Sequence, residues 1–127
     1  MLTLPPSVKI YLASEPVDLR KSIDGLGAIV STRGHDLFSG HLFVFTSRRG
    51  DRVKILAWDR GGFVLYYKRL EQGRFRLPQI AVGAKEVELE ATALAMLLDG
   101  IDMKRVQPPK RWIPSSRRKV VDAGSRS

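Results

Sequence analysis

Short apolar runs alternate with turn-forming clusters through the middle of the chain, between residues 40 and 78. The runs are rich in Val, Ile, Phe, Tyr and Trp, and each break between them contains glycine. Aromatic and β-branched runs separated by short glycine-containing loops are typical of antiparallel hairpins. The pattern therefore predicts a β-meander whose strands lie at 42–46, 53–58, 63–70 and 75–77.

The segments on either side of these runs carry the three- and four-residue apolar spacing of amphipathic helices. The first, 19–31, follows Asp18, whose carboxylate is suited to accept hydrogen bonds from the free amides of a first helical turn. The second, 89–99, is rich in leucine and alanine and is expected to end at Gly100. Two more short strands are expected, at 8–12 and 80–82.

Together these elements predict a single α+β domain over residues 1–105, in which an antiparallel β-meander of about four to five strands is packed by two helices. A length of 127 residues suits one domain with one modest core. From residue 106 the chain is rich in proline, serine and basic residues and has no periodic apolar face. Residues 106–127 are therefore expected to form a basic, flexible tail.

Positive charge is unevenly distributed within a net charge of +9. Residues 40–77 hold nine basic and three acidic side chains, and residues 104–127 hold eight basic and one acidic. Residues 78–103 are acidic instead, and residues 1–39 are balanced. Cations gathered in a predicted sheet and tail indicate a polyanionic partner, most often nucleic acid. A role in solubility alone is the alternative for such a distribution.

The two faces of the predicted hairpins differ in chemistry, provided that Trp58 lies opposite Phe63 and that residues 72–73 form a two-residue turn. One face is apolar and suits the core. The other mixes aromatic rings with guanidinium groups, which single-stranded nucleic acid requires for base stacking and phosphate contacts. Leu56 and Leu65 also fall on this second face, which leaves open the alternative that a helix covers part of it. A one-residue slip would exchange the faces.

The basic and aromatic face and the tail together supply a candidate nucleic-acid site. Its arginine and lysine side chains would contact phosphates, and Trp58 or Tyr67 would stack on bases. The candidate residues are Arg48, Arg49, Arg52, Lys54, Trp58, Tyr67, Arg69, Arg74, Arg76, Lys110, Arg111, Arg117 and Arg118.

No catalytic or metal-binding pattern emerges from the sequence. The chain has no cysteine, and it lacks a glycine-rich phosphate loop, an HExxH motif and a GxSxG motif. His35 and His41 are expected to be solvent-exposed loop residues, and the carboxylates to serve in turns and caps. We therefore expect a protein that is not an enzyme and has no cofactor. A metal nuclease using Asp51 or Asp59 is the less favoured alternative.

No apolar run approaches the roughly 20 residues needed to span a bilayer. The N-terminus lacks the basic and small-residue features of a signal peptide. A cytoplasmic location without membrane contact is expected.

Several sequence blocks, in one order, resemble the TnpB-type accessory proteins of bacterial insertion sequences of family 66. The resemblance runs from about residue 8 to residue 103. Its most distinctive parts are DLRKSIDGL at 18–26, FSG at 38–40, KILAWD at 54–59 and YYKRLEQGRF at 66–75. Many relatives carry a second aromatic residue where this chain has Ala57.

The resemblance implies a non-catalytic accessory role in DNA transposition, beside a separate and larger transposase. The expected partners are DNA, in the form of transposon ends, and the transposase and other element-encoded proteins. The leading hypothesis is direct DNA binding through the basic face and tail. The alternative is a protein–protein adaptor that contacts the transposase, for which the acidic residues Glu86, Glu88 and Glu90 offer a surface to a basic partner.

Overall fold

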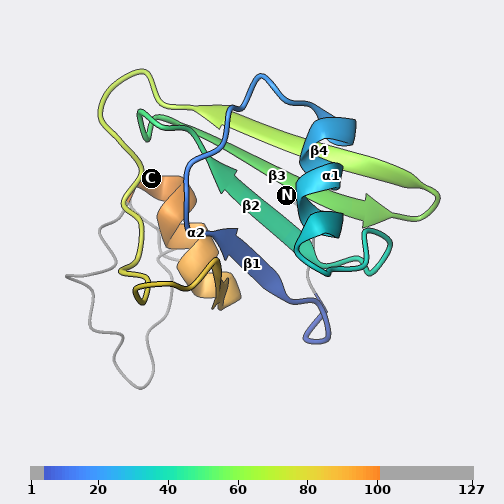
Figure 1. Ribbon diagram of the computed structural model, residues 1–127. Helices are drawn as coiled ribbons and strands as arrows, with labels where there is room; N and C mark the ends of the chain where they lie inside the picture. The colour runs from blue at the N-terminus through green and yellow to red at the C-terminus, as the bar shows by residue number, and fades with distance from the viewer. Residues whose placement is uncertain (1–4, 101–127) are drawn as a thin grey trace.

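A five-stranded sheet and two helices make up the computed structural model, which describes residues 5–100 (Figure 1). The predicted α+β class is confirmed. The predicted tail, 106–127, lies outside the described residues. In chain order the elements are β1 (Ile10–Ala13), α1 (Ile23–Thr32), β2 (Leu42–Thr46), β3 (Arg52–Asp59), β4 (Gly62–Arg69), β5 (Glu86–Leu89) and α2 (Ala91–Asp99).

The strands lie in the order β4-β3-β2-β1-β5. The predicted meander is present in β2, β3 and β4, which pair antiparallel. The sheet is not antiparallel throughout, however, because β1 pairs parallel to β2. A parallel pair requires a long crossover connection, usually a helix, and α1 supplies it here. β5 then pairs antiparallel with β1 and forms the second edge of the sheet.

The assumed register of the central hairpin is confirmed, since Trp58 pairs with Phe63 across β3 and β4. Only Arg60 and Gly61 lie between the last paired residues, and both have positive φ, 47° and 87° respectively. Two positive φ values in a two-residue loop are the mark of a type I′ turn, whose twist matches that of the strands it joins. The turn therefore holds the register of the hairpin.

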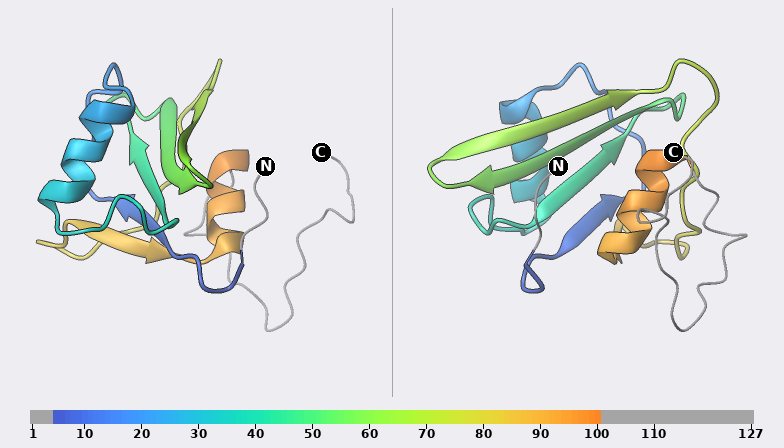
Figure 2. Two further views of the ribbon diagram at one scale, coloured as in Figure 1. Left: turned by 90° about the vertical axis from the view of Figure 1, so that its right-hand side faces the viewer. Right: turned by 180° about the vertical axis from the view of Figure 1, so that it is seen from behind.

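Each helix covers one face of the sheet, so the domain has three layers (Figure 2). On one side α2 packs on Val53, Ile55 and Ala57 of β3, together with apolar residues of β1 and β2. On the other side Leu26 and Val30 of α1 pack with Leu56 of β3 and the phenylalanines of β2. A core on both faces explains why all five residues of β2 are buried.

The expected strands at 75–77 and 80–82 are absent from the described region. The Phe75 ring is buried in the α2-side core, and its backbone amide donates to the carbonyl of Gly50 at 2.7 Å. The alternation of polar and apolar residues at 74–77 therefore does not mark a strand. It arises because the Phe75 side chain is buried within an irregular segment. Arg74 and Arg76 are exposed on this segment and do not belong to the sheet face to which they were assigned.

The first helix begins later than predicted, and Asp18 is not its N-cap. Ser22 occupies that position, and α1 starts at Ile23. Asp18 instead closes a turn before the helix, where its carboxylate accepts from the backbone amide of Arg20 at 3.0 Å and from its guanidinium at 2.8 Å. The side-chain hydrogen bond from Arg20 lowers the pKa of Asp18 to about 2. The second helix ends as predicted at Gly100, in the left-handed conformation.

Both histidines lie in loops, as expected, but each is only half-exposed and makes a specific contact. His35 Nε2 lies 2.8 Å from a carboxylate oxygen of Glu86, and the His35 ring packs on Tyr11 at 4.5 Å between centroids. His41 Nδ1 accepts from the backbone amide of Lys9 at 3.0 Å. These contacts join the loop after α1 to β1 and β5. Neither described helix has the length or apolar character to cross a membrane.

Replacing Leu26 with alanine should weaken the packing of α1 on the sheet. Leu26 is fully buried, and a Leu→Ala change in a core costs about 2–5 kcal/mol in the free energy of unfolding. Urea denaturation measures that free energy. Val82→Ala is the control, because the Val82 side chain is fully exposed and its loss should change the free energy by less than about 0.5 kcal/mol. Equal effects of the two changes would contradict the placement of α1.

The Asp18 carboxyl should titrate near pH 2 instead of 3.8 in a ¹³C NMR titration of the folded protein. Because its pKa is lower in the folded state, its contribution to stability is present above the unfolded pKa and is lost as pH falls toward 2. Arg20→Gln should raise this pKa clearly. Lys21→Gln should raise it less, since Lys21 acts only through its charge. A wild-type midpoint near 3.8 would show that the turn is not formed.

Candidate nucleic-acid interface

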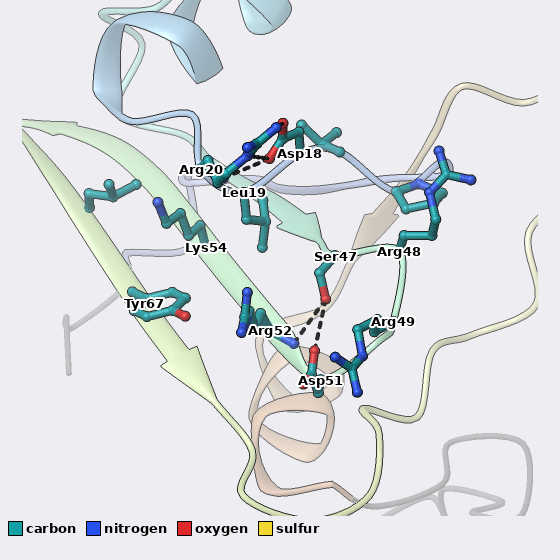
Figure 3. A pocket seen from close by; sticks show the side chains of 13 residues that line it. Asp18, Leu19, Arg20, Ser47, Arg48, Arg49, Asp51, Arg52, Lys54 and Tyr67 are labelled. Atoms are coloured by element: carbon teal, nitrogen blue, oxygen red, sulfur yellow. Dashed lines mark hydrogen bonds and ion pairs between the residues drawn. The ribbon is translucent and has the colours of Figure 1, made fainter.

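A hollow of about 810 Å³ lies where β3 begins and β4 ends, on the face of the sheet that α1 covers farther along (Figure 3). Three segments line it. These are the loop 16–20 before α1, the turn 47–51 between β2 and β3, and the adjoining ends of β3 and β4. The backbone amide of Val17 donates to the carbonyl of Thr46 at 2.9 Å, which fixes the loop against the end of β2.

The turn between β2 and β3 is held by Ser47. Its hydroxyl accepts from the backbone amide of Arg52 at 3.2 Å and donates to a carboxylate oxygen of Asp51 at 3.3 Å. Gly50 takes the left-handed φ of 80° that closes the turn. With its backbone fixed in this way, the turn presents Arg48 and Arg49 as exposed side chains at the hollow.

Arg52, the first residue of β3, lines this site as a half-buried cation. Its Nε is buried and has no hydrogen-bond partner among the described residues. Its cross-strand neighbour is Arg69, so two like charges face each other across the β3–β4 pair. Like charges directly opposite one another are unfavourable, as is a buried donor without an acceptor. An anion in the hollow, which Arg52 lines, would offset the like-charge cost.

Lys54 and Tyr67 form the neighbouring cross-strand pair. The Lys54 ammonium lies 5.3 Å from the centre of the Tyr67 ring, within range of a cation–π contact, and it donates to the carbonyl of Lys21 at 3.0 Å. The Tyr67 residue remains 49% exposed. An aromatic ring thus lies beside the basic side chains on the same wall of the hollow.

The hollow is positively charged. Five basic side chains line it against two carboxylates, a balance of +3. Both carboxylates already have partners, since Asp18 is bound by Arg20 and Asp51 by Ser47. The basic residues are Arg20, Arg48, Arg49, Arg52 and Lys54.

Trp58 does not belong to this site. It lies at the opposite end of β3, six residues from Arg52, which corresponds to about 20 Å along a strand. There it packs edge-on against Phe38 and Phe63, with ring centroids 5.0 and 5.1 Å away. The helix α1 packs on Leu56, midway along this face, and so separates Trp58 from Arg52. The sequence had left open that a helix covers part of this face.

The remaining candidates lie around the hollow or outside the described residues. Arg69 is at the end of β4 and makes an exposed ion pair with Glu71 at 3.2 Å. Arg74 runs beside Gly50, where a Cβ atom would come within 3.5 Å of its side chain. Arg76 is exposed farther along the same irregular segment. The tail candidates that fall outside residues 5–100 are Lys110, Arg111, Arg117 and Arg118.

Sequence reasoning missed the wall formed by residues 16–20. Nothing in the apolar pattern places this loop beside β3, because its position depends on the parallel crossover from β1 to β2. Pro16 was the one local signal that the chain is not helical there. Across residues 5–100, no group of three or more His, Asp or Glu side chains is arranged to hold a metal ion.

Comparison with known proteins agrees with the family resemblance that the sequence blocks indicated. The chain is 38% identical over 107 residues to uncharacterized protein y4jC of Sinorhizobium fredii (strain NBRC 101917 / NGR234), covering 82% of this chain and 90% of that protein. It is 32% identical over 116 residues to uncharacterized protein y4hO of the same organism, covering 91% and 97%. No solved structure matches the chain.

A family model described as IS66 Orf2 like protein matches residues 8–108. This family suggests an accessory role in transposition, and no catalytic activity is indicated for it. The matched region contains both helices, all five strands and the whole basic hollow. On this match and on the two relatives, the chain belongs to the IS66 Orf2-like family of insertion-sequence proteins.

Proposed function

We propose that this protein is a non-catalytic accessory factor for DNA transposition that binds DNA, at transposon ends, through the hollow at the basic end of β3 and β4. One observation carries the proposal. Of the residues that the sequence singled out for nucleic-acid contact, five come together around this hollow, although they come from different segments of the chain. They are Arg48, Arg49, Arg52, Lys54 and Tyr67.

The electrostatics of the hollow support phosphate binding. DNA releases counterions when lysine and arginine side chains neutralise its phosphates, and this release drives binding at low salt. Arg48 and Arg49 are exposed and free to reach a backbone, while Arg52 offers a buried donor that lacks an acceptor within the described region. Arg69 and Arg74 extend the positive surface beyond the hollow.

The carboxylates of the hollow favour binding over cleavage. A metal-assisted nuclease requires carboxylates that are free to hold metal ions about the scissile phosphate. Asp18 is bound by Arg20, and Asp51 accepts from Ser47. Asp59, the other carboxylate considered for such a role, lies at the far end of β3. These positions support turn-forming roles for all three residues.

Arg52→Gln should weaken binding of a fluorescently labelled terminal-repeat DNA by about tenfold at low salt and reduce the slope of log affinity against log salt by about 1. Fluorescence anisotropy across a salt series measures both quantities. Arg60→Gln is the matched control, because it removes the same charge from the exposed turn at the other end of β3. No binding by the wild type at low salt, or equal losses in the two variants, would contradict the proposal.

A second candidate function, an adaptor that contacts the transposase, is favoured by the opposite edge of the sheet. Glu88 on β5 and Glu90 at the start of α2 are exposed, whereas Glu86 is bound to His35. Acidic side chains on a free sheet edge suit a basic protein partner.

Co-purification of the transposase from nuclease-treated extract tests the adaptor function. If the protein is an adaptor, the transposase should remain bound after nuclease treatment, and Glu88→Gln with Glu90→Gln should release it. Loss of the transposase on nuclease treatment alone would show that DNA bridges the two proteins. The Arg52→Gln variant serves as the control, because Arg52 lies on β3, three strands away from β5 in the sheet.

A further inference from the structure

We infer that the hollow takes single-stranded in preference to duplex DNA, with one base stacked on Tyr67 and an adjoining phosphate bound by Arg52. The inference rests on the proposed DNA-binding function and specifies the form of DNA that the same site accepts. Three features of the hollow carry it: its concave shape, its single aromatic wall residue among the described residues, and the half-buried Arg52 beside that residue.

The shape suits a flexible strand. A volume of about 810 Å³ falls within the range of roughly 300–1,000 Å³ typical of pockets that enclose small organic ligands, a class that includes a nucleotide. The walls come from the loop 16–20 on one side and from β3 and β4 on the other (Figure 3). Duplex DNA is read by an element that enters a groove. A recessed site offers it no such element, whereas an unpaired nucleotide can enter the recess.

Tyr67 supplies the stacking surface. Among the described residues that line the hollow it is the only aromatic one, and about half of it is exposed. Base–aromatic stacking is available only to a base that has left its own stack, so a Tyr67 contact selects unpaired DNA. The Lys54 ammonium, 5.3 Å from the ring centre, places a cation next to the position that the stacked nucleotide would occupy.

Arg52 supplies the phosphate contact. Its backbone pairs with that of Arg69 on β4, two positions along from the Lys54–Tyr67 pair, and all four side chains point to the same face of the sheet. Its unsatisfied Nε is buried beneath the surface. A phosphate on the outside of a rigid duplex is held at the rim, where Arg48 and Arg49 are exposed, whereas a single strand can carry its phosphate inward.

The test compares a labelled oligothymidine with a hairpin duplex of the same nucleotide count, using the full-length protein. Both ligands meet the same basic tail, so its contribution is common to every variant and the ratio of the two affinities reports on the hollow. A second oligothymidine carries 2-aminopurine at one central position, whose fluorescence changes when that base stacks on an aromatic ring. The variants are Tyr67→Leu, Tyr67→Phe and Arg52→Gln, with Arg60→Gln as the charge-matched control.

We expect the wild type to bind the single strand about tenfold more tightly than the hairpin. Tyr67→Leu should remove most of this preference and the 2-aminopurine signal, Tyr67→Phe should keep both, and Arg60→Gln should change neither. Thermal unfolding of each variant verifies folding. Tyr67→Thr, whose β-branched side chain suits a strand, replaces Tyr67→Leu should the latter unfold.

Equal or tighter binding of the hairpin, weakened by Arg52→Gln, would overturn the single-strand inference while leaving the proposed DNA-binding function intact. The same conclusion would follow if Tyr67→Leu weakened both ligands equally. Affinities for both ligands that do not change in Arg52→Gln would overturn the function and the inference together, since binding would then occur elsewhere on the chain.

Discussion

The pairing of β3 with β4 in a single register is the constraint on which the rest of the structure depends. Side chains alternate between the two faces of a strand, so this register decides which residues meet on each face. It places Val53, Ile55 and Ala57 under α2, and it places Leu56 under α1. The type I′ turn at residues 60–61 allows no slip without loss of its two positive φ values. Both helices and the basic hollow therefore rely on one hairpin.

The same register brings the basic residues together. On the face of α1, the cross-strand pairs run from Trp58–Phe63 through Leu56–Leu65 to Lys54–Tyr67 and Arg52–Arg69. The helix covers the apolar centre of this row and leaves the basic end open. The loop before α1 then folds against that end and converts part of a sheet face into a concave site. The apolar packing of α1 on the sheet thus fixes the position of the site, although α1 itself does not line the hollow.

Much of this arrangement could be predicted from the residues. Alternation and turn glycines gave the central hairpin and its register, and the presence of Leu56 and Leu65 on the basic face indicated helical cover. The parallel pairing of β1 could not be predicted, because local pattern does not reveal the direction in which a strand enters a sheet. Phe75 was misread because one buried aromatic between arginines has the period of a strand. Its amide instead bonds to Gly50.

The candidate site likewise contains some residues that the sequence placed together and others that it could not place. Arg52, Lys54 and Tyr67 were placed together by strand period alone, and they do share the hollow. Trp58 shares their face but not their position, because period-two reasoning gives the side of a sheet and not the distance along it. Arg48 and Arg49 were chosen as candidates because their segment is rich in basic residues. Their position near Arg52 depends on the turn that Ser47 holds. Asp18 was read from the sequence only as a helix cap, and the position of its loop at the hollow is seen only in the folded structure.

Membership in the IS66 Orf2-like family and a hollow lined by five cations support the proposed function, in which this protein contributes to transposition by binding DNA at the basic end of its central hairpin. Amide chemical-shift mapping of the ¹⁵N-labelled protein during titration with DNA tests this claim most directly. The account predicts that the largest changes in the folded domain fall at residues 16–20, 47–54 and 67. Changes confined to the tail, or centred on β5, would contradict it.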